Sequence, residues 1–368
     1  MTVGETTFTR KDTAFVKGIA LMLMIIHHCC APYERLPLSV ETIEAFKLAH
    51  ITQTIGVFGQ ICVSMFFFLG GYGLYKRYSR NELSLLRDLK HLYSLYWKVL
   101  FVFVPIGFLF FRGVPTEYAD KLFNIRFEHF HIDRFLWNLT AMQTDYNFEW
   151  WFITPYIFML IYGYIFVNLQ KSRNISLDLL LLLIITILFQ GGTIVSAINP
   201  LTPLAQDKIL GQMLHPDQRS SLFFVGILCA RYNFLDLVKA RLSRLNNYQL
   251  VILSLITIYA CFRIRNTGTA GLAGEWIIVI FLSFALITFN RFALVSKTVC
   301  FIGKHSANMW LIHSFFCYYF LTVCLHVVFV FENTLIAALI TLLLSLVSSI
   351  LLNRFYVFLF SLFSHNAS

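Results

Sequence analysis

The chain has 368 residues, of which 58% are hydrophobic and only 13% are charged, and its mean hydropathy is +0.70. A composition this apolar excludes an ordinary soluble enzyme and predicts a polytopic integral membrane protein. The net charge is +10, but the basic residues gather in short segments between apolar stretches, which indicates membrane topology and argues against nucleic acid as a partner.

Ten apolar stretches are long enough, or nearly so, to cross a hydrocarbon core that needs about 20 helical residues. The fifth, sixth and seventh are short, and the last is long enough to include a tilted or interfacial part. We therefore expect an all-α bundle of about ten transmembrane helices, forming a single domain over residues 1–368. The stretches lie near 14–31, 54–75, 94–111, 150–168, 176–190, 220–235, 249–262, 275–290, 306–331 and 334–362.

The first stretch contains two ionisable residues, Lys17 and His28, and ionisable groups at membrane depth usually mark function. Eleven helical steps return to within roughly 20° of the starting direction, so both residues share a helix face about 16 Å apart. His27 points about 100° away from His28, and we expect it to pack or to hydrogen-bond. Lys17 has a simpler interpretation as a residue that snorkels to the cytoplasmic interface. Because no small-residue cleavage site follows, we expect a retained signal anchor.

Charged residues between the stretches set the orientation, because cytoplasmic loops are enriched in lysine and arginine. An inside N-terminus places most basic residues in cytoplasmic segments, so with ten spans we expect both termini to be cytoplasmic. Those loops would face anionic lipid of the inner leaflet. The longest segment outside the membrane, about 113–149, is external, aromatic and acidic, and we expect it to cap a pocket or to meet a polar substrate. The external acids are Glu34, Glu41, Glu44, Glu117, Asp120, Glu128, Asp133, Asp145 and Glu149.

The second stretch contains the run Gly70-Gly71-Tyr72-Gly73. Glycines weaken a helix but let a neighbouring helix or a ligand approach closely, and we expect close helix packing here. The run is not a nucleotide-binding loop, because the strand and the remaining glycine spacing are missing. The eight cysteines lie almost wholly within the expected spans without CxxC spacing, so we expect packing residues rather than disulfides or metal ligands.

Further candidate residues follow in the second half of the chain. Trp150 and Trp151 begin the fourth stretch on the external side, where they either anchor the interface or stack on a sugar ring. Glu149, directly before them, either orients a histidine, binds an acceptor or is an ordinary interface carboxylate. Arg263, at the external end of the seventh stretch, either contacts an anionic glycan or is a plain interface charge. His313, in the ninth stretch, either supports a site or satisfies a neighbouring helix.

Five segments, in order along the chain, resemble motifs of acyltransferase family 3, membrane proteins that O-acylate bacterial surface polysaccharides. They resemble its Arg/Lys-x10-His signature, its phenylalanine-rich stretch, its basic and tyrosine-rich start of the third helix, its Trp-Phe helix start and its Gly-x-x-Ser…Tyr-Leu-x-His element. Gly70 departs from the family, which usually has serine there. The segments are Lys17 to His28, Met65 to Gly73, Lys90 to Trp97, Glu149 to Ile153 and Ile302 to Ser314.

The resemblance implies a multi-pass enzyme of the bacterial inner (plasma) membrane that moves an acyl group, here taken as acetyl, from cytoplasmic acyl-CoA to a hydroxyl. The acceptor would be a surface or exported polysaccharide, or its lipid-linked glycolipid precursor. Acetyl-CoA would be the donor substrate, with no bound cofactor and no metal. The candidate catalytic residues are His28, His313 and Glu149, the residues for coenzyme A are Lys17, Lys90 and Arg77, and those for the acceptor are Trp150, Trp151 and Arg263.

The chemistry of the residue types agrees with these roles. Histidine titrates near neutral pH, which suits His28 as a general base that removes the hydroxyl proton. A lysine ammonium often binds phosphate, and the pantetheine arm of coenzyme A has a length of the same order as the separation between Lys17 and His28.

Two alternatives remain open. A glycolipid or polysaccharide transporter or flippase is also polytopic with charged residues in its spans, but it should show related halves, and no internal symmetry is evident. A polysaccharide polymerase would usually need a large basic external loop, whereas the longest external segment here is acidic on balance.

Overall fold

A computed structural model describes residues 7–32, 35–36, 51–113, 126–189, 217–268 and 271–365, and within these ranges every regular element is a helix. The expected all-α class is therefore confirmed. In the described part of the chain, seven helices are long and apolar enough to cross a membrane, or up to nine if each of two bent helix pairs forms one span. The expected count of ten and the cytoplasmic termini stay predictions. The acidic residues Glu34, Glu41, Glu44, Glu117 and Asp120 lie outside the described residues.

The chain forms two compact units, each assembled from several separate stretches of the chain. Three helices, α1 (Arg10–Cys30), α5 (Leu85–Phe110) and α16 (Ala293–Ser314), begin in the first unit and end in the second. The first unit comprises Met1–Ala20, Ile61–Leu89 and Phe152–Cys300, and the second comprises Leu21–Gln60, Lys90–Trp151 and Phe301–Ser368.

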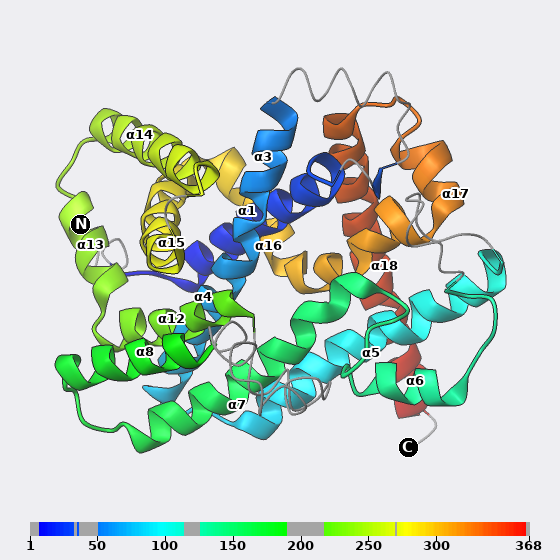
Figure 1. Ribbon diagram of the computed structural model, residues 1–368, viewed down its shortest axis with the longest axis horizontal. Helices are drawn as coiled ribbons and strands as arrows, with labels where there is room; N and C mark the ends of the chain where they lie inside the picture. The colour runs from blue at the N-terminus through cyan, green and yellow to red at the C-terminus, as the bar shows by residue number, and fades with distance from the viewer. Residues whose placement is uncertain are drawn as a thin grey trace, which may run out of the picture. The chain divides into compact units, whose positions relative to one another are not determined.

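The first unit is built on a close crossing of α4 (Ile61–Tyr78) and α12 (Ser221–Arg231), which lie side by side in Figure 1. A Cβ atom added to Gly71 would collide with the backbone carbonyl of Phe223, and one added to Gly226 would collide with that of Phe68. The glycines therefore let the two backbones touch, which confirms the close packing expected from the glycine run. α12 is buried along its whole length, as expected for a helix that is apolar on all sides.

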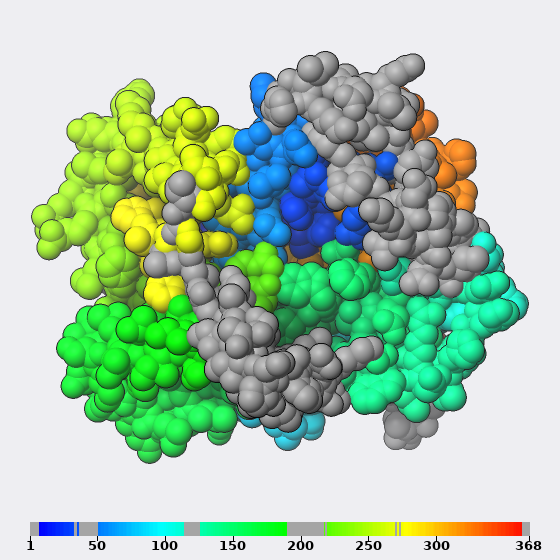
Figure 2. Space-filling model, in the orientation of Figure 1, coloured from blue at the N-terminus to red at the C-terminus, as the bar shows by residue number. Residues whose placement is uncertain are grey.

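In the described part of this unit, the other α-helices that lie wholly within it are α7 (Ile153–Leu169), α8 (Ile175–Phe189), α13 (Phe234–Leu242), α14 (Asn247–Asn266) and α15 (Gly271–Thr288). The helices α7, α8 and α13 contact α12, whereas α14 and α15 pack against each other. Figure 2 shows α8 and α14 at the surface, and both expose long apolar side chains there. Apolar faces of this extent are unusual in soluble monomers and suit contact with lipid. With 15 residues, α8 is shorter than a standard membrane crossing.

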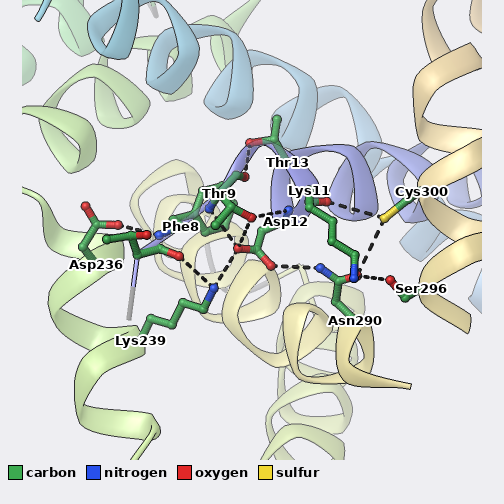
Figure 3. Close-up of polar contacts among 11 residues, drawn as sticks. Phe8, Thr9, Lys11, Asp12, Thr13, Asp236, Lys239, Asn290, Ser296 and Cys300 are labelled. Atoms are coloured by element: carbon green, nitrogen blue, oxygen red, sulfur yellow. Dashed lines mark hydrogen bonds and ion pairs between the residues drawn. The ribbon is translucent and has the colours of Figure 1, made fainter. Parts of the chain in front are cut away.

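Asp12 fixes the first turn of α1 to the rest of this unit (Figure 3). Its carboxylate accepts hydrogen bonds from the backbone amide and the hydroxyl of Thr9, from the ammonium of Lys239 at 2.8 Å and from the amide of Asn290 at 2.9 Å. The hydroxyl of Ser296 donates to Asn290 in turn. Asp12 is only 5% exposed, so these donors replace the water that its charge would otherwise bind.

The second unit contains α3 (Ile51–Gly59), α6 (Ile132–Leu139), the π-helical segments η7 (Phe315–Tyr319) and η8 (Cys324–Val328), α17 (Leu321–Val323) and α18 (Thr334–His365), besides the ends of α1, α5 and α16. The glycines Gly56 and Gly59 bring α3 into backbone contact with the end of α1. α18 packs against η7 and η8. All eight cysteines of the chain are buried and none is in a disulfide, as expected for packing residues.

The ninth stretch differs from its expected form. The sequence predicts a span near 306–331, but α16 begins at Ala293, and the chain bends by 77° between Ala293–Tyr319 and Leu321–Val328. The early part is too polar to stand out as an apolar stretch, and one of its polar residues, Ser296, is buried in the protein rather than turned to lipid. The sixth stretch is also bent, by 65° between α12 and α13.

Candidate active site

A π-helical turn at the end of α16 positions two of the residues that surround His28. The amide of Phe320 bonds to the carbonyl of Phe315, five residues earlier, at 2.7 Å. Residues five apart align on one face of such a turn, and π-turns of this kind are frequent at functional sites. His313 and Tyr318 accordingly both pack on His28, with ring centroids 4.9 Å and 5.7 Å from its own.

His28 contacts two polar side chains through its two ring nitrogens. Nδ1 lies 3.2 Å from the hydroxyl oxygen of Tyr318, and Nε2 lies 3.7 Å from a carboxylate oxygen of Glu149. The His28 side chain is 13% exposed and that of Glu149 is 6% exposed. The ring of His27 packs edge-on against that of His28, with ring centroids 5.1 Å apart, and its Nδ1 lies 2.9 Å from the Gly56 carbonyl oxygen, which confirms its expected packing or hydrogen-bonding role.

Glu149 lies in a 3₁₀ turn, η3 (Phe148–Phe152), and Arg35 compensates its charge. The guanidinium of Arg35 donates to the other carboxylate oxygen at 3.0 Å and stacks over the ring of Tyr318 at 4.1 Å. The backbone amide of Glu149 donates to the side chain of Asn147 at 3.0 Å. A nearly buried carboxylate requires such partners, so Arg35 and Asn147 hold Glu149 in place behind His28.

His313 is fully buried next to His28. Its Nδ1 lies 2.7 Å from the carbonyl of Trp310, and a carbonyl oxygen can only accept, so Nδ1 carries the hydrogen. Among the described residues, Nε2 of His313 has no hydrogen-bond partner. The neighbouring Ser314 hydroxyl and the Asn147 amide bond each other at 2.7–2.9 Å, which ties the end of α16 to the segment before Glu149.

Two residues of this cluster, Arg35 and Tyr318, have no strong signal in the sequence. Arg35 follows the first apolar stretch as one of many interface charges. Tyr318 lies five residues after His313, a spacing that puts two residues on different faces of an α-helix and on one face only in a π-turn. An α-helical period therefore does not predict that Tyr318 lies beside His28.

The expected residues for coenzyme A are divided between the units. Lys17 and Arg77 belong to the first unit, where Arg77 forms an ion pair with Asp88 at 2.8 Å. Lys90 is exposed and belongs to the second unit. Their grouping around one ligand therefore stays a prediction, as does the role of Arg263, which is exposed in the first unit at the end of α14.

Trp150 occupies the interior of the second unit. It is fully buried, its indole donates to the carbonyl of Leu311 at 2.8 Å, and its ring packs against Tyr96 and Phe315. This placement gives it a packing role and leaves no face of its ring open for a sugar. Trp151 is partly exposed, so a stacking role for that residue stays a prediction.

The comparison with protein families agrees with the motifs. A family model described as an acyltransferase domain matches residues 14–354, a range that runs through both units. No curated protein and no solved structure matches the chain.

Proposed function

Because the chain belongs to acyltransferase family 3, whose model matches residues 14–354, we propose that it transfers an acetyl group from cytoplasmic acetyl-CoA to a hydroxyl outside the cytoplasm. The proposed acceptor is a surface or exported polysaccharide or its lipid-linked precursor, and the proposed location is the bacterial inner membrane. The contact of His28 with Glu149 carries the mechanism, because it places a titratable base next to a charge that favours its protonated form.

In the proposed reaction, Nε2 of His28 removes the proton from the acceptor hydroxyl while the hydroxyl oxygen attacks the thioester carbonyl carbon. The tetrahedral intermediate collapses, the carbon–sulfur bond breaks, and the leaving thiolate takes the proton from His28. The products are an O-acetyl ester and free coenzyme A. A positioned base of this kind contributes typically 10²–10⁴-fold to a rate.

Glu149 supports this step through its charge rather than through a hydrogen bond. The 3.7 Å separation between the carboxylate oxygen and Nε2 exceeds hydrogen-bond length. Nε2 therefore forms no hydrogen bond with Glu149 that would compete with the acceptor hydroxyl. Once Nε2 is protonated, the imidazolium faces a carboxylate of opposite charge, and their attraction, reduced by the ion pair between Glu149 and Arg35, stabilises the protonated form. Arg35 keeps the carboxylate in position.

Lys17 is the proposed contact for the phosphates of coenzyme A. No hydrogen bond or ion pair of its ammonium is found among the described residues, and Arg77 lies close enough to interact with it electrostatically. Arg77 is itself paired with Asp88, so the charge that remains is that of Lys17, and a cation in the interior of a membrane protein favours an anionic ligand. The thioester would then extend along α1 toward His28, over a distance that its eleven helical steps set at about 16 Å.

Substitution of the two adjacent histidines by asparagine tests the proposal. An asparagine amide resembles the Nδ1 side of histidine, so His28→Asn keeps a donor near Tyr318 and removes only Nε2. His27→Asn makes the same change with its donor directed to Gly56. Purified wild-type protein supplied with acetyl-CoA and isolated host polysaccharide should release free thiol and form O-acetyl groups visible by NMR.

We expect His28→Asn to lose both signals and His27→Asn to keep them. If thiol release and O-acetylation never depend on the wild-type protein, and only the amount of exported glycan changes in cells, the acyltransferase proposal fails and a transporter replaces it.

A further inference from the structure

The hydroxyl of Tyr318 lies against two atoms of the same residue. Its oxygen is 2.6 Å from the backbone carbonyl oxygen of His28 and 3.2 Å from Nδ1 of the His28 ring. A carbonyl oxygen can only accept a hydrogen bond, and a phenol has a single hydrogen to donate. The short contact therefore uses the hydroxyl hydrogen, and the oxygen of Tyr318 is left to accept at the other contact.

These two contacts determine which ring nitrogen of His28 carries the hydrogen. If the oxygen of Tyr318 accepts, Nδ1 must donate, and a neutral imidazole that carries hydrogen on Nδ1 has a bare Nε2. We infer that Tyr318 is a positioning residue that selects the Nδ1–H tautomer of His28 and so keeps Nε2 available as the base. This inference rests on the proposed acyl transfer.

His313 also carries its ring hydrogen on Nδ1, but a different acceptor holds it there. The carbonyl of Trp310 accepts from its Nδ1 at 2.7 Å, so His313 also carries hydrogen on Nδ1. Both neutral histidines thus have a bare Nε2. The difference is that a backbone carbonyl fixes His313, whereas a single removable hydroxyl fixes His28.

Glu149 makes the hydroxyl of Tyr318 necessary. A carboxylate 3.7 Å from Nε2 attracts a hydrogen to that nitrogen, and the resulting Nε2–H tautomer cannot accept a proton from the acceptor hydroxyl. Tyr318 opposes this rearrangement, and the guanidinium of Arg35, stacked on its ring at 4.1 Å, holds the phenol in place. Without the hydroxyl, the same carboxylate that stabilises the imidazolium would favour the unreactive form.

Nitrogen-15 NMR of histidine-labelled full-length protein in lipid nanodiscs tests the inference, at a pH where both imidazoles are neutral. The signals of the two rings are assigned by their loss in His28→Asn and His313→Asn. In the wild type, His28 should show a protonated Nδ1 and a bare Nε2. In Tyr318→Phe, hydrogen should move to Nε2 of His28, whereas the signals of His313 should not change because Trp310 still fixes it.

Steady-state kinetics provide the second readout. We expect Tyr318→Phe to lower kcat by about tenfold or more, which is part of the contribution of a general base, with the KM for acetyl-CoA unchanged. The matched control is Tyr356→Phe, which removes another tyrosine hydroxyl that donates to a backbone carbonyl, that of Lys98, and should leave both the tautomer and kcat unchanged.

Three outcomes overturn the inference: a wild-type His28 with hydrogen on Nε2, a Tyr318→Phe variant with unaltered His28 signals, or an equal fall in kcat in Tyr356→Phe. The wild-type spectrum decides the matter even if Tyr318→Phe does not fold. Failure of the proposed function looks different, because the wild type would then release no thiol while the histidine signals still report the tautomer.

Discussion

Nε2 of His28 lies 3.7 Å from a carboxylate oxygen of Glu149, although the two residues come from distant parts of the chain. One ends the first long helix and the other sits in the short turn before α7. Both belong to the second compact unit. Their contact unites a base and a charge that favours its protonation, which is what the proposed removal of a proton from the acceptor hydroxyl requires.

Replacing Glu149 by glutamine should reduce acetyl transfer while preserving the shape of the site. The neutral amide no longer attracts the His28 imidazolium, so we expect kcat to fall by about 10²-fold, within the range for general-base catalysis. Thiol release from acetyl-CoA measures the effect. Glu128→Gln is the control, because Glu128 also lies beside a histidine, His129, but is exposed. Equal activity of the Glu149→Gln variant and the wild type would contradict this role.

Replacing Lys17 by methionine should weaken donor binding rather than slow the chemical step. The uncharged side chain fills a similar volume but offers no charge to phosphate, so we expect the KM for acetyl-CoA to rise about tenfold with kcat nearly unchanged, equivalent to about 1.4 kcal/mol. Lys11→Met in the same helix is the control, since Lys11 is exposed. A fall in kcat at constant KM would place Lys17 elsewhere in the reaction.

Replacing Asp12 by asparagine should destabilise the first unit. The change leaves the Lys239 ammonium without its carboxylate, which costs about 1–3 kcal/mol. At about 2–4 °C per kcal/mol, the thermal midpoint of the detergent-solubilised protein should fall by several degrees. Glu82→Gln, at an exposed position of the same unit, should not change it. A double variant with Lys239→Met that loses no more than Asp12→Asn alone would demonstrate the coupling.

Replacing Gly71 by alanine should prevent α4 from docking on α12. The new methyl group would collide with the backbone carbonyl of Phe223, which cannot move aside as a flexible side chain can, and overpacking costs about 1–3 kcal/mol or more. The amount of folded protein in membranes should therefore drop. Gly73→Ala is the matched control and should leave the yield nearly unchanged, because its methyl group would contact the end of the Arg77 side chain at 3.7 Å. Similar yields of the two variants would refute the close crossing.

The sequence alone predicted the all-helical membrane class, and its motifs indicated the acyltransferase family. It also predicted that the glycine run packs closely, that the cysteines are buried and that His27 hydrogen-bonds. These features depend on local composition and on the period of the helix, which a single stretch of chain already contains. The same reasoning placed Lys17 and His28 on one face of one helix.

The bent forms of the sixth and ninth stretches were beyond such reasoning. Hydropathy locates apolar residues, but the first turns of α16 carry polar side chains, among them the buried Ser296, so they appear too polar for a span. The bend after Tyr319 depends on a π-turn, which has no simple sequence pattern because one extra residue is accommodated by the packing around it.

The sequence by itself therefore determined the class of protein, its family and the placement of His28 on the same helix face as Lys17. Only the tertiary structure decided that Glu149, Arg35 and Tyr318 surround that histidine and that Trp150 is a packing residue. The physical reason is that contacts between distant segments follow from helix packing and from the register of one π-turn, whereas periodicity and hydropathy report only on neighbours along the chain.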